Sequence, residues 1–413
     1  MRKFVLTFII FIFVLSFTTI SLCYDTSSSY IWSSDYSATL EASSSISTST
    51  NVEDNNSLNL ESGSAILIEQ STGQVLYSHN SHEKLRPASV TKVMSILLIM
   101  EQIDSGRLSY TEQIPCSENA RSMGGSQIWL DTKETLTVDE MLKAICVVSA
   151  NDYVVAMAEH IAGSEEAFVQ MMNDKAKELG MNDTTFKNCH GIDEDGHITS
   201  AYDIALMSRE LLSKHPDITK YTTIWMDSLR DGKSQLVNTN KLIRTYKGIT
   251  GLKTGSTSLA LYNLSASATR DNLSLIAVIM KAPSTKVRFA EASKLLDYGF
   301  SKFSFKNFGN KNDVIQNVNV RKGVKNTVNA ILENNAGTLI EKGKENQITQ
   351  NITINDNIQA PLKKGDKIGE VTFTLDGQTL ATTNLVAENN IDKITPFTTC
   401  KQIIYSWVDL LRS

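Results

Sequence analysis

The chain has 413 residues and a formal net charge of -5, from 40 Lys and Arg against 45 Asp and Glu. This length allows two or three domains with full-sized hydrophobic cores. The composition has no basic excess, so it excludes binding to nucleic acid through overall charge and favours a ligand that is neither a polyanion nor a polycation.

The N-terminal residues have the pattern of an export signal. Arg2 and Lys3 precede an apolar run from Phe4 to Leu15, and small or polar residues follow up to a cleavage site expected near Cys23. We therefore predict a signal peptide over residues 1–23 and an exported, extracytoplasmic protein. The alternative is an uncleaved signal anchor, although the apolar run is near the shorter limit for spanning a membrane.

Residues 24–62 are rich in Ser, Thr and Asn. Such a segment lacks the apolar surface that would offset the entropy cost of ordering the chain. We predict a disordered tether here, with folded structure starting at about Ser64.

The next part of the chain carries strand and helix patterns. Two short apolar runs on either side of the turn signal Ser71-Thr72-Gly73 predict a hairpin. Pro87 favours the entry of a helix, and Thr137 with Glu140 has the pattern of a capping box, so a helix should follow each. The hairpin strands are expected at residues 65–69 and 75–77, and the helices at 89–105, 138–148, 152–161, 165–179 and 201–212.

Strand patterns return after the helices. The runs 252–255, 259–268 and 274–280 are apolar, and Arg270-Asp271-Asn272 is a turn signal between the last two. Strands lie at both ends of this region. One antiparallel sheet that is built from both ends and covered by helices would bury the apolar faces of all these strands and helices. We predict an α/β fold of the α+β type over residues 63–305.

The pattern changes again at about Lys306. Short alternating runs, such as Val371–Leu375 before the turn Asp376-Gly377, predict a separate small all-β domain over residues 306–394. Beyond it, apolar positions at helical spacing predict an amphipathic C-terminal helix over residues 395–413. This helix either packs onto the β domain or lies in a membrane interface, and the sequence leaves both alternatives open.

The cysteines and histidines do not form a metal-binding pattern. His190 and His197 lie in a glycine-containing loop that favours structure or substrate contact, and Cys146 fits a helix core. The sequence predicts no metal and no cofactor, and it assigns no disulfide. The cysteines beyond the signal segment are expected to be mostly free or buried thiols: Cys116, Cys146, Cys189 and Cys400.

Ser89 and Lys92 combine a nucleophile with a base. Residues three apart on a helix share a face, so the Lys92 amine should lie beside the Ser89 hydroxyl. A serine attacks carbonyls only when a neighbour takes its proton, and a lysine can do so if burial or another cation keeps it partly neutral. The Ser-x-x-Lys pattern is weak alone, since Ser81 and Lys84 repeat it in a polar segment that is expected to be a surface loop.

Three short motifs stand in order along the chain: Ser89-Val90-Thr91-Lys92, Ser149-Ala150-Asn151 and Lys253-Thr254-Gly255. This set is typical of class A β-lactamases and penicillin-binding proteins. The chain resembles the low-molecular-mass penicillin-binding proteins that are serine-type D-alanyl-D-alanine carboxypeptidases, with a β-lactamase/transpeptidase-like fold. Further blocks that are similar to this family lie at 86–89, 163–168, 190–196, 251–255, 263–269 and 360–365.

The resemblance implies a role for the residues of the first two motifs. Ser89 would attack the carbonyl of the penultimate D-Ala of a peptidoglycan stem peptide, and Lys92 would be the base for this attack. Ser149 would relay a proton to the leaving amine. Asn151 would hold Lys92 and the substrate amide.

The third motif would bind the end of the substrate. By the same resemblance, Lys253 and Thr254 would hold the terminal carboxylate, and the backbone amides of Ser89 and Ser256 would form an oxyanion hole. Gly255 would let the strand edge approach the substrate closely. Peptidoglycan stem peptides and β-lactam antibiotics are the expected ligands, with a membrane surface as a further partner of the C-terminal helix.

Three other functions are open at this point. A β-lactamase needs a deacylating base, and the segment Glu178-Leu179-Gly180-Met181-Asn182 lies at a predicted helix end, which disfavours fast penicillin hydrolysis. A DD-endopeptidase would use the same residues on cross-linked peptides. A scaffold with a decayed site is the non-enzymatic alternative, and the intact motifs argue against it.

Overall fold

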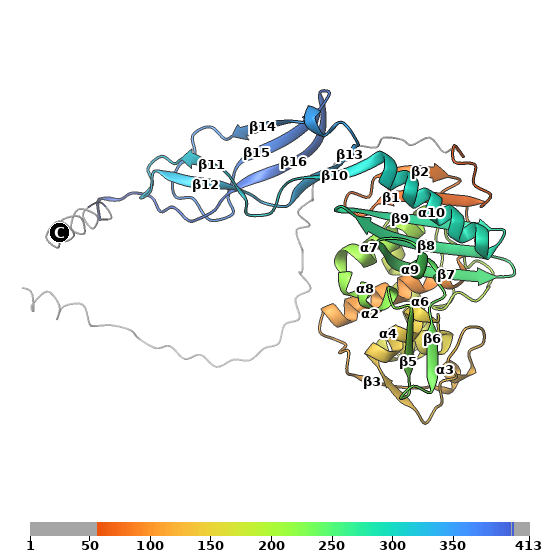
Figure 1. Cartoon of the computed structure of the whole chain (residues 1–413). Helices are drawn as coiled ribbons and strands as arrows, with labels where there is room; N and C mark the ends of the chain where they lie inside the picture. The colour runs from red at the N-terminus through yellow and green to blue at the C-terminus, as the bar shows by residue number, and fades with distance from the viewer. Residues whose placement is uncertain (1–55, 398, 400–413) are drawn as a thin grey trace, which may run out of the picture. The chain divides into compact units, whose positions relative to one another are not determined.

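The structure is a computed structural model that describes residues 56–397 and 399 (Figure 1). The predicted signal peptide, the tether up to residue 55 and nearly all of the predicted C-terminal helix lie outside the described residues. Within the described part of the chain, no helix is both long and apolar enough to cross a membrane.

A five-stranded antiparallel sheet forms the centre of the first folded region, with strand order β2-β1-β9-β8-β7. The N-terminal strand β1 pairs with β9, so Ile66 lies opposite Val278. This arrangement confirms the predicted sheet built from both ends of the region. Its strands are β1 (Ser64–Glu69), β2 (Val75–His79), β7 (Ile249–Thr257), β8 (Leu261–Arg270) and β9 (Leu273–Ala282).

Helices cover both faces of this sheet (Figure 1). On one face lies α10, whose buried residues include Leu295 and Phe300 and pack with Leu67 and Leu275 of the sheet. The sequence analysis missed this helix, although Ser284 caps it by accepting a hydrogen bond from Val287 N. The larger helices are α2 (Lys92–Asp104), α4 (Val138–Val147), α5 (Asn151–Ala162), α6 (Glu165–Glu178), α7 (Ala201–Lys214) and α10 (Thr285–Lys302).

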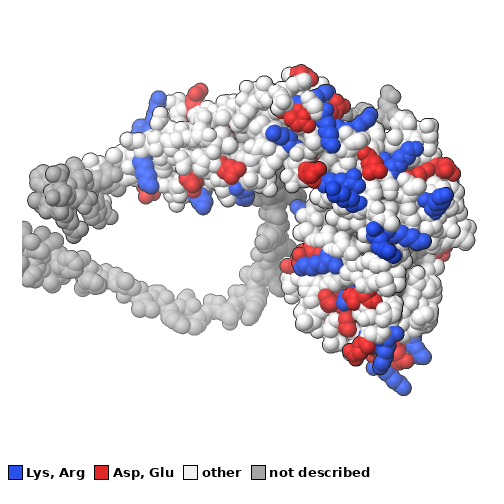
Figure 2. Space-filling model, viewed as in Figure 1, with Lys and Arg blue, Asp and Glu red and all other residues white. Residues whose placement is uncertain are grey.

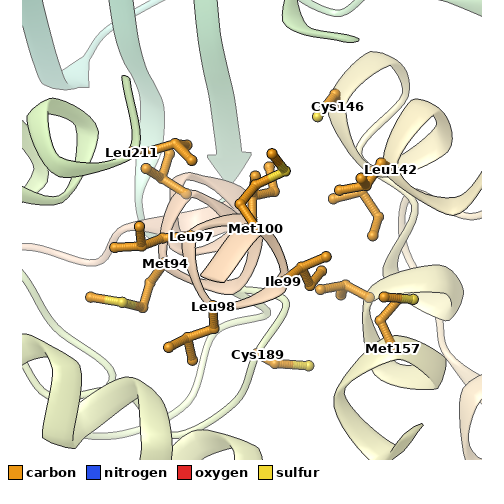
Figure 3. Close-up of a cluster of buried hydrophobic side chains, with 14 of the residues drawn as sticks. Met94, Leu97, Leu98, Ile99, Met100, Leu142, Cys146, Met157, Cys189 and Leu211 are labelled. Atoms are coloured by element: carbon orange, nitrogen blue, oxygen red, sulfur yellow. The ribbon is translucent and has the colours of Figure 1, made fainter. Parts of the chain in front are cut away.

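The core on the other face is organised around α2, which is buried from Lys92 to Met100. A helix that is apolar all round belongs inside a protein, because no face of it gains from contact with water. Figure 3 shows Leu142 of α4, Met157 of α5 and Leu211 of α7 directed toward α2. The expected capping box at the start of α4 is present between Thr137 and Glu140.

Short elements complete this region. They are η1 (Ala88–Thr91), β3 (Gln113–Pro115), α3 (Glu118–Ser122), β4 (Thr135–Thr137), η2 (Pro216–Ile218), α8 (Thr219–Thr222), β5 (Met226–Leu229), β6 (Ser234–Val237) and α9 (Leu242–Thr245). The pairs β3–β4 and β5–β6 are two-stranded antiparallel sheets.

The C-terminal part is all-β, as predicted, and its first strand begins at Phe303. It has a five-stranded sheet of order β11-β12-β16-β15-β14 and a two-stranded sheet β10-β13. Its own core includes Val371, Phe373 and Leu385. The elements are β10 (Phe303–Gly309), β11 (Val314–Asn319), β12 (Thr327–Leu332), β13 (Ala336–Glu341), η3 (Glu345–Gln347), β14 (Thr349–Ile354), β15 (Lys367–Leu375) and β16 (Gln378–Ala387).

The last residues of the predicted tether, 56–62, differ from the expectation. The Asn56 side chain hydrogen-bonds both the N–H and the carbonyl of Leu60, and Leu60 is buried. Glu291 of α10 accepts hydrogen bonds from the backbone N–H groups of Glu61 and Ser62. Side chains from elsewhere thus satisfy this backbone, so folded structure begins before Ser64.

Charged side chains are distributed without a dominant sign on the face seen in Figure 2. Lys and Arg alternate there with Asp and Glu over the described residues.

Candidate active site

Ser89 lies at the entrance to the buried helix α2. The predicted single helix begins instead with the 3-10 turn η1, and α2 follows from Lys92. The Lys92 amine still reaches the hydroxyl, and Nζ donates to Ser89 Oγ at 3.2 Å. The structure therefore brings the two residues together as their spacing predicts.

Lys92 is buried completely and has two further acceptors. Its Nζ donates to Asn151 Oδ1 at 2.6 Å and to the backbone carbonyl of His190 at 2.7 Å. Burial, and then the charge of Lys253, hold the pKa of Lys92 well below its usual value. A lysine in this environment can be neutral at moderate pH and accept a proton from Ser89.

Ser149 and Asn151 lie at the join of α4 and α5. Ser149 has a φ of 67°, and its buried Oγ has no hydrogen-bond partner among the described residues. Asn151 donates from its backbone N–H to Ser126 O and from Nδ2 to Gly124 O, each at 2.7 Å. These bonds orient the side-chain amide of Asn151 so that its Oδ1 faces Lys92.

The third motif lies on β7, the edge strand of the sheet. Lys253 is buried, and its Nζ donates to Thr254 O at 3.0 Å. Burial, and to a lesser extent Arg288, lower the pKa of Lys253 to about 7. Thr254 Oγ1 donates to Thr239 Oγ1 at 2.7 Å, and Ser256 is exposed at the edge.

Gly255 and Gly191 let two segments close on the Ser89 backbone. A Cβ on Gly255 would lie 2.9 Å from Ser89 N, and a Cβ on Gly191 would also lie 2.9 Å from it. Gly191 has a φ of +91° as well, which favours glycine. Any side chain at these positions would push β7 or the 190–191 loop away from Ser89.

Asn263 on β8 connects the sheet to the residues before Ser89. Its Nδ2 donates to the carbonyls of Arg86 and Pro87 at 2.8 and 3.0 Å, and its Oδ1 accepts from Lys281 N at 2.8 Å. Arg288 of α10 donates to the carbonyls of Gly255 and Asn263 from behind β7. The nucleophile is therefore held against the sheet by side chains that the motifs do not include.

Asp152 fixes the loop opposite the sheet. Its carboxylate is buried and accepts from Ile128 N at 3.0 Å and from Leu130 N at 3.1 Å. Burial raises the pKa of Asp152, and these hydrogen bonds oppose the increase. The loop that it holds also contains Gly124 and Ser126, which bind Asn151.

A pocket of about 270 Å³ lies beside His190. Acidic side chains dominate its wall, among them Glu165, Glu166, Asp193 and Glu194. The described residues contain no group of His, Cys, Asp and Glu that could hold a metal ion. Cys146 is buried as expected, and burial raises the pKa of its thiol to about 12.

Pattern reasoning from the sequence missed four contributors to this site. The His190 carbonyl is a backbone group, which no residue type reveals. Asn263 and Arg288 act from a strand and a helix that are distant in sequence from Ser89. Asp152 follows Asn151 directly and lies in the first turn of α5, where an acidic residue is common, so its position gives no signal of a further role.

Comparison with known proteins shows the family of this chain. A family model described as D-alanyl-D-alanine carboxypeptidase matches residues 48–284, and a model of the C-terminal domain of penicillin-binding protein 5 matches residues 303–393. The chain therefore belongs to the D-alanyl-D-alanine carboxypeptidase family of low-molecular-mass penicillin-binding proteins. The resemblance and the fold class expected from the sequence are confirmed, apart from the C-terminal helix, which lies almost wholly outside the described residues.

Individual relatives support the same assignment. The D-alanyl-D-alanine carboxypeptidase DacF of Bacillus subtilis is 45% identical over 351 residues, covering 84% of this chain and 90% of the relative. Penicillin-binding protein 5 from Haemophilus influenzae has a TM-score of 0.71 at 31% identity, covering 81% of this chain and 98% of that one. The ampicillin-bound penicillin-binding protein D2 from Listeria monocytogenes has a TM-score of 0.54 at 30% identity, covering 59% and 99%.

Proposed function

We propose that this protein is a serine DD-carboxypeptidase that removes the terminal D-alanine from peptidoglycan stem pentapeptides. One observation carries the proposal. The amine of Lys92, fully buried and with a lowered pKa, lies 3.2 Å from the hydroxyl of Ser89 at the edge of strand β7. A hydroxyl beside a neutral buried amine is an activated nucleophile.

Acylation begins when Ser89 Oγ attacks the carbonyl carbon of the penultimate D-Ala. Lys92 Nζ takes the hydroxyl proton. The oxyanion of the tetrahedral intermediate accepts hydrogen bonds from the backbone N–H groups of Ser89 and Ser256. A donor of this kind typically contributes about 2.7–4 kcal/mol to the transition state. The close approach of Gly255 to Ser89 N supports this position for the oxyanion.

The bond to the terminal D-Ala then breaks. Ser149 donates its hydroxyl proton to the leaving amine and receives in return the proton that Lys92 took from Ser89, a role that suits its buried Oγ without a partner among the described residues. Lys253 and Thr254 hold the terminal carboxylate of the substrate, and Asn151 binds the amide before the scissile bond. Water hydrolyses the Ser89 ester and restores the hydroxyl.

β-Lactams are expected to acylate the same serine. Their strained amide would occupy the position of the scissile bond, and their carboxylate would bind Lys253. The ampicillin-bound and cefotaxime-bound structures of penicillin-binding protein D2 from Listeria monocytogenes support this expectation.

The test is D-alanine release from a muramyl pentapeptide by the chain from residue 56 onward, alongside labelling by a fluorescent penicillin. Ser89→Ala should abolish both, whereas Ser81→Ala, the serine of the other Ser-x-x-Lys pattern, should leave both intact. Labelling without D-alanine release would move the assignment to a DD-endopeptidase on cross-linked peptides. Labelling that survives Ser89→Ala would refute Ser89 as the nucleophile.

Export and membrane contact are part of the same proposal. The basic start and apolar run before Cys23 support export, and the 79% exposure of Phe397 supports an amphipathic segment that meets a membrane interface. Sequencing the N-terminus of the mature protein tests the first point, because an intact Met1 would exclude cleavage. Sedimentation with phospholipid vesicles, with and without residues 395–413, tests the second, and equal sedimentation would exclude it.

A further inference from the structure

The segment 188–192 contacts both Ser89 and Lys92, yet it belongs to no helix or strand. Its His190 carbonyl accepts from Lys92 Nζ, and Gly191 packs against the backbone of Ser89. Outside regular structure, the direction of a peptide group depends on whatever binds the neighbouring N–H and C=O groups. The position of the lysine amine therefore depends on the partners of this segment.

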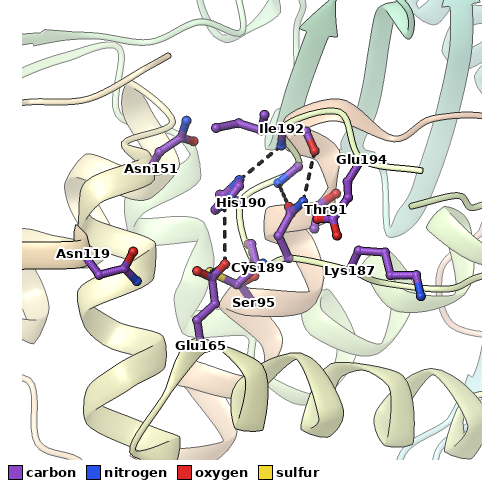
Figure 4. A network of polar contacts seen from close by, with 12 residues as sticks. Thr91, Ser95, Asn119, Asn151, Glu165, Lys187, Cys189, His190, Ile192 and Glu194 are labelled. Atoms are coloured by element: carbon purple, nitrogen blue, oxygen red, sulfur yellow. Dashed lines mark hydrogen bonds and ion pairs between the residues drawn. The ribbon is translucent and has the colours of Figure 1, made fainter. Parts of the chain in front are cut away.

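Three side chains bind the backbone of this segment, and Figure 4 labels two of them, Ser95 and Glu165. Glu165 Oε1 accepts from Cys189 N at 3.2 Å and from the Cys189 thiol at 3.3 Å. Ser95 Oγ donates to Cys189 O at 2.6 Å, and Asn188 Oδ1 accepts from Gly191 N at 2.7 Å. Side chains thus bind the backbone groups on both sides of the His190 carbonyl.

Glu165 differs from the other two partners because its side chain is a carboxylate, and it lies in the first turn of α6. Its side chain is 17% exposed, and its Oε1 lies 3.4 Å from His190 Nε2. Burial and Lys92 lower the pKa of His190 to about 3, so the ring is neutral. With Nδ1 accepting from Ile192 N, the proton lies on Nε2 and points to Glu165.

We propose that Glu165 is a positioning residue for the reaction of Ser89 and Lys92. Its carboxylate accepts from the Cys189 N–H and lies 3.4 Å from Nε2 of the His190 ring, and it thereby keeps the His190 carbonyl on Lys92 Nζ. Charge-assisted hydrogen bonds are stronger than neutral ones, which suits a contact that must hold a loop. This inference rests on the proposed roles of Ser89 and Lys92.

The rate of Ser89 acylation by a fluorescent penicillin, measured against pH, is the appropriate readout. Glu165→Ala should lower the plateau rate constant by about tenfold or more, because small displacements of reacting groups have large effects. It should also move the acid limb to lower pH, since a carbonyl acceptor stabilises the charged ammonium and its loss favours the neutral amine. The titratable groups facing Lys92 are Lys253, Asp152, Cys189 and His190.

Two further variants sharpen the test. Glu165→Gln keeps an acceptor oxygen for Cys189 N, so its rate constant should lie within about threefold of the wild type. Glu166→Ala removes the neighbouring carboxylate, which is exposed and also lines the pocket, and should leave both the rate and the acid limb unchanged.

Each outcome decides the proposal. If Glu165→Ala lowers only the fraction of molecules that label, with an unchanged rate constant and acid limb, the residue is merely structural and the proposal fails. An equal loss of the acylation rate constant in Glu166→Ala would also overturn the proposal, because the loss would then follow from removing any negative charge from the pocket. Wild-type protein that does not label at Ser89 would refute the proposed function, and this inference with it.

Discussion

The two five-stranded sheets of this protein are buried in different ways. In the central sheet β1 is buried along its whole length, because helices cover both faces. In the C-terminal sheet β14 is exposed at five of its six positions, and β15 alternates between buried and partly exposed residues. A sheet that is covered on both faces can surround polar groups with low-dielectric material, and a half-covered sheet cannot.

The buried polar residues follow this difference. Lys253, Asn263 and Ser265 are buried on the central sheet or at its edge, and Lys92 is buried beside it. In the C-terminal part, the residues Glu341, Lys344 and Glu345 have shifted pKa values mainly through hydrogen bonds at the surface. Groups whose pKa is shifted by burial, and which are suited to catalysis, therefore lie where helices cover both faces of the sheet.

The largest effect is expected when Lys92, the buried base, is removed, and this change tests the comparison of buried with exposed polar groups most strongly. Lys92→Met should lower the rate constant of Ser89 acylation by about 10²–10⁴-fold, because proton transfer in the transition state is lost. Stopped-flow labelling with a fluorescent penicillin measures it. Lys84→Met changes the exposed lysine of the other Ser-x-x-Lys pattern and should have no effect. Comparable losses in both variants would show that burial is irrelevant.

The two buried lysines should give a bell-shaped dependence of acylation on pH. The rate rises as Lys92 becomes neutral and falls above about pH 7, where Lys253 loses the charge that binds the carboxylate. Lys253→Arg should move the alkaline limb upward by more than about two pH units, because a guanidinium stays charged. An alkaline limb that does not move would remove Lys253 from the pH dependence.

Asn263→Ala tests the buried polar network of the central sheet through stability. It leaves two carbonyls and one N–H without their partner, which should lower the free energy of unfolding by about 2–3 kcal/mol. Urea unfolding followed by loss of penicillin labelling reports on this region alone. Asn351→Ala on exposed β14 is the matched change, and hydrogen exchange of the β14 and β15 amides, which reports on the C-terminal sheet, should show a loss within about 0.5 kcal/mol. Similar values for the two would contradict the comparison.

The smallest effect on catalysis is expected from the C-terminal sheet. Ile352 is 40% exposed on β14, and its antiparallel partner Val371 is fully buried on β15. Val371→Ala should destabilise the C-terminal sheet by about 2 kcal/mol, whereas Ile352→Ala should change little. Neither should alter D-alanine release from a soluble pentapeptide. A loss of release in Val371→Ala, in folded protein, would show that the two sheets are coupled.

Local patterns were read correctly from the sequence where the contact spans a few residues. The Thr137–Glu140 capping box and the Ser89–Lys92 pair follow from backbone geometry over one turn. The 3-10 form of η1 and the ordered residues 56–62 were not foreseen, since each depends on distant partners such as Asn263 and Glu291. Helix α10 was missed although Ser284 marks its start.

The amino-acid order was therefore sufficient for the sheet, for the helices on one of its faces and for selecting the motif residues, because periodicity and short-range spacing are local properties. It did not reveal that the His190 carbonyl binds Lys92 or that Glu165 holds the segment that carries it. Those contacts join α2, α6 and the loop that follows α6, and they involve backbone groups, which are the same in nearly every residue type. Only packing of the folded chain selects which of these groups meet.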